Sequence, residues 1–252
     1  MVLAYRFRFL VVSSLLGCAA CGRVGYDPLD AAIGDASVPC APDEIACGGF
    51  EGPLGGWSVR IEPQSDGIVR VVDDPERGGA LAITSEGGGP GLAVAETYFE
   101  PVIEGSLHGR VWLRVGARTE IDEFVVAVQL DDGNDDGTQK VSLDLLSGDA
   151  LGLTATTAHP AVRNGAAPGT IRRDEWMCLR FEVDLRDDGG AARLSEGMQP
   201  LASAESIDTI PDGGFRRLML GAVGPSAGVR DVLFDDVALA RHPLPCQSGP
   251  RR

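Results

Sequence analysis

Apolar and polar residues alternate with a period of two in several short segments of this chain. The clearest is residues 110–115, where Val111, Leu113 and Val115 alternate with two arginines and a tryptophan. A β-strand points successive side chains to opposite faces, so this pattern predicts a strand with one buried face. The same alternation predicts strands over residues 124–130, 141–145, 179–185, 218–222 and 232–240.

Clusters of Gly, Asp and Pro separate these segments, for example at residues 87–90, 131–137 and 212–214. Such residues supply turn geometry. No segment shows the apolar spacing of an amphipathic helix with caps. Many short strands between turns predict an all-β protein, a two-sheet antiparallel jelly-roll sandwich with one core.

The N-terminal residues follow another pattern. Arg6 and Arg8 precede an apolar run over residues 9–16. A basic start, a short apolar run and small residues after it are typical of a secretory signal, and the run is shorter than the about 20 residues that span a bilayer. The expected organisation is a signal peptide over 1–17, a flexible lipidated tether over 18–46, a domain over 47–246 and a tail over 247–252.

Residues Leu15-Leu16-Gly17-Cys18 resemble the lipobox of bacterial lipoproteins, in which the cysteine is acylated and becomes the mature N-terminus. The resemblance implies that Cys18 is lipidated and that the protein is exported and anchored to the cell envelope through this lipid. Ala19, rather than Asp, after the cysteine favours the outer membrane. The alternatives are acylation of Cys21, which fits less well, and an ordinary signal peptide cleaved near Ala19 and Ala20.

The net charge of the chain is −15, and it becomes −17 once residues 1–17 are removed, because they carry two arginines and no acidic residue. Nucleic-acid binding needs Lys and Arg to neutralise phosphates, so this charge argues against it. The negative net charge also disfavours electrostatic attachment to an anionic membrane.

Four cysteines lie after the lipobox region: Cys40, Cys47, Cys178 and Cys246. An even number in an exported protein indicates disulfides, and the absence of a CxxC pair among these four argues against zinc. Pairing of Cys40 with Cys47 and of Cys178 with Cys246 is favoured. The alternative joins Cys47 to Cys246 and Cys40 to Cys178.

A set of motifs occurs in a fixed order along the domain: Phe50-Glu51, Trp57, residues 78–83, 107–115, 176–182 and 234–239, and Pro245-Cys246. In this order the domain resembles the concanavalin A-like lectin/glucanase (LamG-like) jelly roll of bacterial surface lipoproteins. The resemblance implies neighbouring first and last strands, and core positions for Trp57 and Trp176. A galactose-binding-like sandwich is the alternative fold. Members of the superfamily bind glycans, cleave polysaccharides or mediate adhesion, so the fold alone does not decide the function.

Alternation places His108, Arg110, Trp112 and Arg114 on one face of a strand. Sugars stack on exposed rings, and guanidinium groups pair with carboxylate or sulfate, so this face is a candidate site for an acidic glycan. The alternative is an ordinary solvated face. Tyr98 and Phe99 are further candidate sugar platforms.

Residues Glu120-Ile121-Asp122 resemble the start of the Glu-x-Asp-x-x-Glu strand of retaining glucanases. Those enzymes need a second carboxylate about 5 Å from the first. Phe124 and Val125 stand where it is expected, so the pair is incomplete, and the segment reads as a loop.

Asp132, Asn134 and Asp136 match the first half of a calcium-binding loop. Leu143 stands where the bidentate glutamate belongs, and an acidic hairpin loop explains the same residues. Calcium is therefore the one cofactor that the sequence suggests.

These observations predict a lipid-anchored, non-catalytic module of the cell envelope that recognises a glycan or a surface protein through one sheet face. The alternatives are a polysaccharide lyase or hydrolase of the same fold and a structural envelope lipoprotein.

Overall fold

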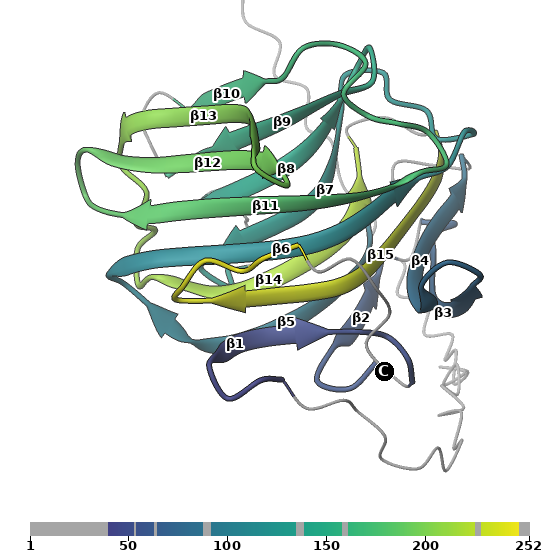
Figure 1. The fold of residues 1–252 in the computed structure, drawn as a ribbon, viewed down its shortest axis with the longest axis horizontal. Coiled ribbons are helices and arrows are strands. Elements are labelled where there is room, and N and C mark those ends of the chain that lie inside the picture. The colour runs from purple at the N-terminus through teal and green to yellow at the C-terminus, as the bar shows by residue number, and fades with distance from the viewer. Residues whose placement is uncertain are drawn as a thin grey trace, which may run out of the picture. The chain divides into compact units, whose positions relative to one another are not determined.

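The computed structural model describes residues 40–246, except 53, 63–64, 88–91, 135–138, 158–160 and 225–227. The described residues form fifteen β-strands and no helix. All pairs of neighbouring strands are antiparallel, and the strands make two sheets that face each other (Figure 1). The prediction of a two-sheet antiparallel sandwich is confirmed. No helix in the described part of the chain is long and apolar enough to cross a membrane.

The front sheet has eight strands, in the order β13-β12-β11-β6-β15-β4-β3, with β1 paired to β15. Their bounds are β1 Glu44–Gly48, β3 Ile68–Asp74, β4 Gly78–Glu86, β6 Gly105–Val115, β11 Trp176–Leu185, β12 Gly190–Glu196, β13 Gln199–Ile207 and β15 Val229–Ala240.

The back sheet has seven strands, in the order β10-β9-β8-β7-β14-β5-β2. Their bounds are β2 Ser58–Ile61, β5 Ala93–Val102, β7 Phe124–Asp131, β8 Lys140–Leu146, β9 Ala150–Ala155, β10 Val162–Gly165 and β14 Phe215–Val223.

The core fills the space between the sheets. On β6 the odd-numbered residues Leu107, Val111, Leu113 and Val115 are completely buried. The strand predicted over residues 110–115 is therefore present, with its predicted buried face. The other five predicted strands also lie within observed strands, namely β7, β8, β11, β14 and β15.

A glycine in β6 makes room for an aromatic core residue. Gly109 pairs across the strands with Phe181 of β11. A Cβ atom at Gly109 would lie 1.8 Å from Cζ of Phe181. The phenyl ring therefore lies directly against the glycine backbone.

The first and last strands are neighbours, as the resemblance implied. Glu44 of β1 pairs with Ala240 of β15. The strand begins inside the segment expected as a tether, so the ordered domain starts several residues before the expected boundary at residue 47. The expected signal peptide, Cys18 and the tail over 247–252 lie outside the described residues.

Two disulfides join Cys40 to Cys47 and Cys178 to Cys246. This is the favoured pairing. The first ties the chain before β1 to the strand itself. The second holds the segment after β15 against the outer face of β11.

Candidate functional site

The outer face of the front sheet carries the residues predicted to bind a ligand. His108, Arg110, Trp112 and Arg114 alternate with the core residues of β6, so all four point away from the other sheet. The prediction that they share one face agrees with the burial pattern. Their surroundings, however, differ from those of an open cationic patch.

Arg110 is only 2% exposed. Its Nη2 atom lies 2.8 Å from Oδ1 of Asp236, and its Nη1 atom donates to the carbonyl of Pro245. The C-terminal segment that carries Pro245 is fixed by the disulfide at Cys246. Arg110 is thus neutralised and covered, which does not favour the expected contact with a ligand.

Trp112 packs against Arg77, whose guanidinium carbon lies 4.2 Å from the centre of the ring. Arg77 also forms an ion pair of 2.7 Å with Asp235. Burial raises the pKa of Asp235 to about 6, and Arg77 only partly opposes that rise. The ring of Trp112 therefore packs on an arginine that is itself paired with Asp235, and it is not a free surface on which a sugar can stack.

Arg114 pairs with Asp74 at 2.8 Å. The same carboxylate accepts a hydrogen bond from the indole of Trp176. Trp176 is half-buried on the outer face, so the core position implied for it is wrong, whereas Trp57 is 8% exposed and lies in the core. The charge of Arg114 is already balanced within the protein.

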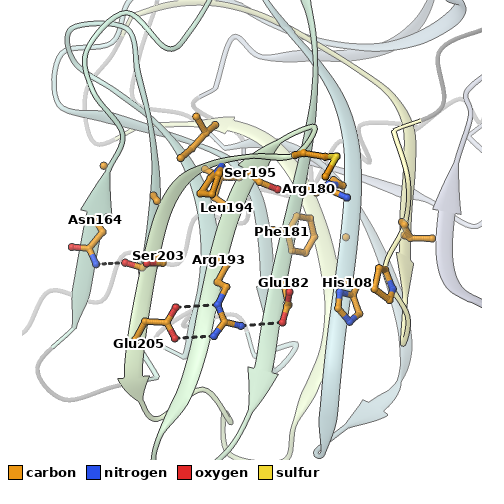
Figure 2. Close-up of a pocket in the computed structure, with 18 residues that line it drawn as sticks. His108, Asn164, Arg180, Phe181, Glu182, Arg193, Leu194, Ser195, Ser203 and Glu205 are labelled. Carbon is orange, nitrogen blue, oxygen red and sulfur yellow. Dashed lines mark hydrogen bonds and ion pairs between the residues drawn. The ribbon is translucent and has the colours of Figure 1, made fainter.

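A hollow of about 720 Å³ lies beside these residues on the front sheet. It spans β6, β11, β12 and β13, reaches Asn164 of β10, and is bordered by Pro243 and Leu244 (Figure 2). Among the four predicted ligand residues only His108 lines it. Burial lowers the pKa of His108, with Glu182 opposing the change, so the ring is neutral at pH 7.

Ion pairs occupy one side of this hollow. Arg193 pairs with Glu182 at 3.0 Å and with Glu205 at 2.8 Å, as Figure 2 shows. These three residues come from neighbouring strands and are all partly exposed. Arg180 lies on the same face and forms no such pair with any described residue.

The outer face of the back sheet carries a second set of polar residues, which sequence reasoning missed. Arg217 of β14 is 1% exposed, and Asp131 of β7 is completely buried. Nε of Arg217 lies 2.8 Å from Oδ1 of Asp131. Burial disfavours the charged form of Arg217, but hydrogen bonds to Asp131 and Tyr98 outweigh this effect and raise its pKa.

Tyr98 of β5 lies opposite Arg217 and is 54% exposed. Its hydroxyl accepts a hydrogen bond of 3.3 Å from Nη1 of Arg217 and donates one of 3.5 Å to Glu96. Tyr98 was a candidate platform, and it is exposed, whereas Phe99 packs against the core. An exposed ring is therefore fixed in place by a buried ion network.

A second polar group continues along the same face. Asp144 of β8 is completely buried and accepts hydrogen bonds from Ser142 and Thr154. Arg163 of β10 donates to Thr154 at 2.9 Å and covers the ring of Phe124 at 4.1 Å. Burial raises the pKa of Asp144, and the two hydroxyl donors oppose it.

The described part of the expected calcium loop shows hydrogen bonds within the loop. Asp132 accepts hydrogen bonds from the backbone and the side chain of Asn134. Asp136 lies outside the described residues. The described part of the chain holds one His/Cys/Asp/Glu group of ligand-like spacing, at Cys40, Glu44 and Cys47, and its two cysteines form a disulfide. Calcium at the loop stays a prediction.

The segment expected as a loop rather than a catalytic strand lies between β6 and β7. The carboxylate of Glu120 accepts a hydrogen bond from the backbone of Val229, and the backbone carbonyl of Glu120 accepts one from Arg230. Glu120 therefore helps to hold two loops together.

Comparison with known proteins gives the fold and no family. No protein-family model matches the sequence, and no curated protein matches it. Among solved structures, the chain is similar to an alginate lyase from a Chlorella virus at 9% identity and a TM-score of 0.57, covering 79% of this chain and 100% of that one. A cellulose-induced protein matches at 13% identity and a TM-score of 0.54, covering 75% and 94%.

A carbohydrate esterase from a Shiga toxin-encoding bacteriophage matches at 16% identity and a TM-score of 0.54, covering 78% of this chain and 97% of that one. The binding domain of botulinum neurotoxin DC in complex with SialylT matches at 11% and 0.54, and there the match covers 48% of that chain. These likenesses show a shared β-sandwich fold, consistent with a lectin/glucanase-like jelly roll.

Proposed function

We propose that this chain is a lipid-anchored, non-catalytic module of the bacterial cell envelope that binds a glycan through the outer face of its back sheet. Tyr98 carries the proposal. Its ring is exposed on the solvent side of a sheet while its hydroxyl is held by Arg217 and Glu96. A rigid ring gives a sugar a stacking surface at low entropic cost.

Buried ion pairs on a solvent-facing side of a sheet support this interpretation. Removing charges from water costs several kcal/mol per ion, so a buried pair is weak evidence of a stabilising role. The pair of Arg217 and Asp131 instead fixes the groups around it. Such preorganisation favours ligand binding because the side chains need not be ordered when the ligand arrives.

The size of the face suits an extended saccharide. Seven strands at a spacing of about 4.8 Å give a width of roughly 29 Å. Accessible polar groups are distributed across it, with Arg60 on β2, Tyr98 on β5, Lys140 on β8 and Arg163 on β10. Several sugar units could each meet a donor or an acceptor.

The envelope location rests on the sequence together with the disulfides. Two disulfides indicate an oxidising compartment, which fits an exported protein. The lipobox resemblance supplies the anchor at Cys18, and multiple acyl chains bind a membrane stably at about 0.8 kcal/mol per buried methylene. The structural neighbours that bind or process carbohydrates favour a glycan over a surface protein as the partner.

A glycan array followed by product analysis tests this function. The proposal expects the wild-type protein to bind one class of polysaccharide without releasing new reducing ends or unsaturated products. Binding to no glycan would instead favour a structural envelope lipoprotein.

Polysaccharide cleavage is a second candidate, because the Tyr98 hydroxyl lies beside the guanidinium of Arg217. Tyrosine near a cation is a suitable general base in a lyase. Tyr98→Phe separates the two functions. It should keep binding, because the ring remains, and it should abolish cleavage if the hydroxyl transfers the proton.

A further inference from the structure

Arg180 lines the hollow of the front sheet. It stands on β11 between Arg110 of β6 and Ser195 of β12, which are its neighbours across the strands. It forms no hydrogen bond or ion pair with the residues that the structure describes, and its Nε atom is buried without a hydrogen-bond partner. Figure 2 places it at the upper end of the polar face, next to Ser195.

This position is unfavourable for stability. A buried donor without an acceptor has lost its hydrogen bonds to water with no replacement, and a like charge on the adjacent strand adds repulsion. The nearest cationic neighbours are satisfied, since Arg110 pairs with Asp236 and Arg193 pairs with two glutamates. The chain has 37 acidic residues, yet none pairs with Arg180 in the described structure.

The surroundings of Arg180 form a site of suitable size. The hollow of about 720 Å³ lies within the range of roughly 300–1,000 Å³ that small-ligand sites occupy. Ser195 and the neutral His108 line the hollow and can form hydrogen bonds with sugar hydroxyls. Pro243 and Leu244 also line the hollow, and they belong to the C-terminal segment that the Cys178–Cys246 disulfide holds in place.

We propose that this hollow is a second ligand site that takes a carboxylate-bearing sugar, with the carboxylate paired to the Arg180 guanidinium. The planar fork of arginine matches a carboxylate with two parallel hydrogen bonds. The hydroxyl, the imidazole and the apolar border suit the remainder of a sugar ring. The site lies on the opposite sheet from Tyr98 and is independent of the function proposed for that face.

Nitrogen-resolved NMR of the arginine Nε–H groups reports on this site directly. Glucuronate should shift the Arg180 signal in a saturable way, and methyl glucoside should not shift it. Inorganic sulfate at the same concentrations tests whether the site binds any anion or specifically a carboxylate-bearing sugar. A response to sulfate as strong as that to glucuronate would overturn the assignment to a sugar, and no response to glucuronate would overturn the site.

Two variants with the same change in charge complete the test. Arg180→Gln should weaken glucuronate binding by roughly tenfold or more, because a charged hydrogen bond is lost. Its melting temperature should stay the same or rise, since no native partner is lost and repulsion with Arg110 is relieved. Arg118→Gln, on an exposed side chain paired with Glu86, should not change the affinity.

Unchanged affinity in Arg180→Gln would contradict the proposal. A melting temperature several degrees lower would also contradict it, because it would show a structural role for the arginine. Tyr98→Ala should leave glucuronate binding at this hollow intact, so this result is separate from the test of the back sheet.

Discussion

Several charged side chains on the outer faces of the two sheets form ion pairs with one another. Arg77, Arg110 and Arg114 each have a carboxylate partner on the front sheet, and Arg217 has one on the back sheet. Because these arginines are already paired with carboxylates of the protein, a strand face rich in arginine need not be a surface that binds an anionic ligand. Arg180 differs from these residues by having no such partner in the described structure.

The pair of adjacent acids at Asp235 and Asp236 gives a prediction about pH. Burial raises the pKa of Asp235 to about 6, above the 3.8 of an exposed aspartate. The folded state therefore binds a proton at a pH where the unfolded state does not, so stability increases as the pH falls from above 6 toward 4. Between pH 7.5 and pH 5 the gain should be about 1 kcal/mol.

Thermal unfolding of the wild type and Asp235→Asn at both pH values checks this prediction. The variant cannot titrate at this position, so the difference between the two proteins should change by that amount with pH. An equal response of both proteins to pH would contradict the raised pKa.

Alternation along β6 was enough to predict which residues share a face, because it depends only on local backbone geometry. The partners of those residues could not be predicted, because they come from distant parts of the chain. Arg77 and Asp235, for example, are 158 residues apart. The same reason explains why Arg180 and the group around Arg217 were missed.

At the level of strands, the predictions rest on alternation of apolar and polar residue types, as in β6, β8 and β11, and not on exposure, since β7 and β8 are buried at nearly every position. Among the missed strands, β13 is largely exposed along its length, and β9 is buried at all six positions with few polar residues. Edge position and two-sided burial are properties of the assembled sheet, and a single segment does not reveal them.

The contact of Gly109 with Phe181 predicts the effect of one methyl group. Gly109→Ala should destabilise the domain by about 1–3 kcal/mol, because overpacking forces the ring or the backbone to move. Gly56→Ala is the matched control, since a Cβ atom there meets nothing within 4 Å. Denaturant unfolding of both variants measures the difference. A similarly small effect for both would show that the core at Phe181 adapts freely.

The two disulfides allow a comparison of loop lengths. Cys178 and Cys246 are separated by 68 positions, and Cys40 and Cys47 by 7. The chain-entropy model gives about 4 kcal/mol for the long loop and about 2 kcal/mol for the short one. Double replacement by serine should therefore lower the melting temperature more at Cys178 and Cys246. A larger loss from the short loop would indicate that its contacts, not chain entropy, dominate.

The whole molecule combines an expected lipid anchor with a β-sandwich that has distinct outer faces. Cys18→Ser should prevent acylation and move the protein from the detergent phase to the aqueous phase in a partition experiment. Mass spectrometry of the mature N-terminus should show acyl chains in the wild type. An unmodified wild-type N-terminus would contradict the anchor and leave the glycan-binding proposal unaffected.

Binding through Tyr98 on the back sheet can be measured with glycan-array profiles of matched variants. The wild type and Tyr98→Phe should bind the same glycans, because both retain the ring. Tyr98→Ala should lose the glycans that bind the back sheet and keep only the uronate binding of the front-sheet hollow. Met198→Ala, at a residue 93% exposed beside that hollow, should keep the back-sheet glycans. An unchanged profile in Tyr98→Ala would show that glycans do not bind through this face of the back sheet.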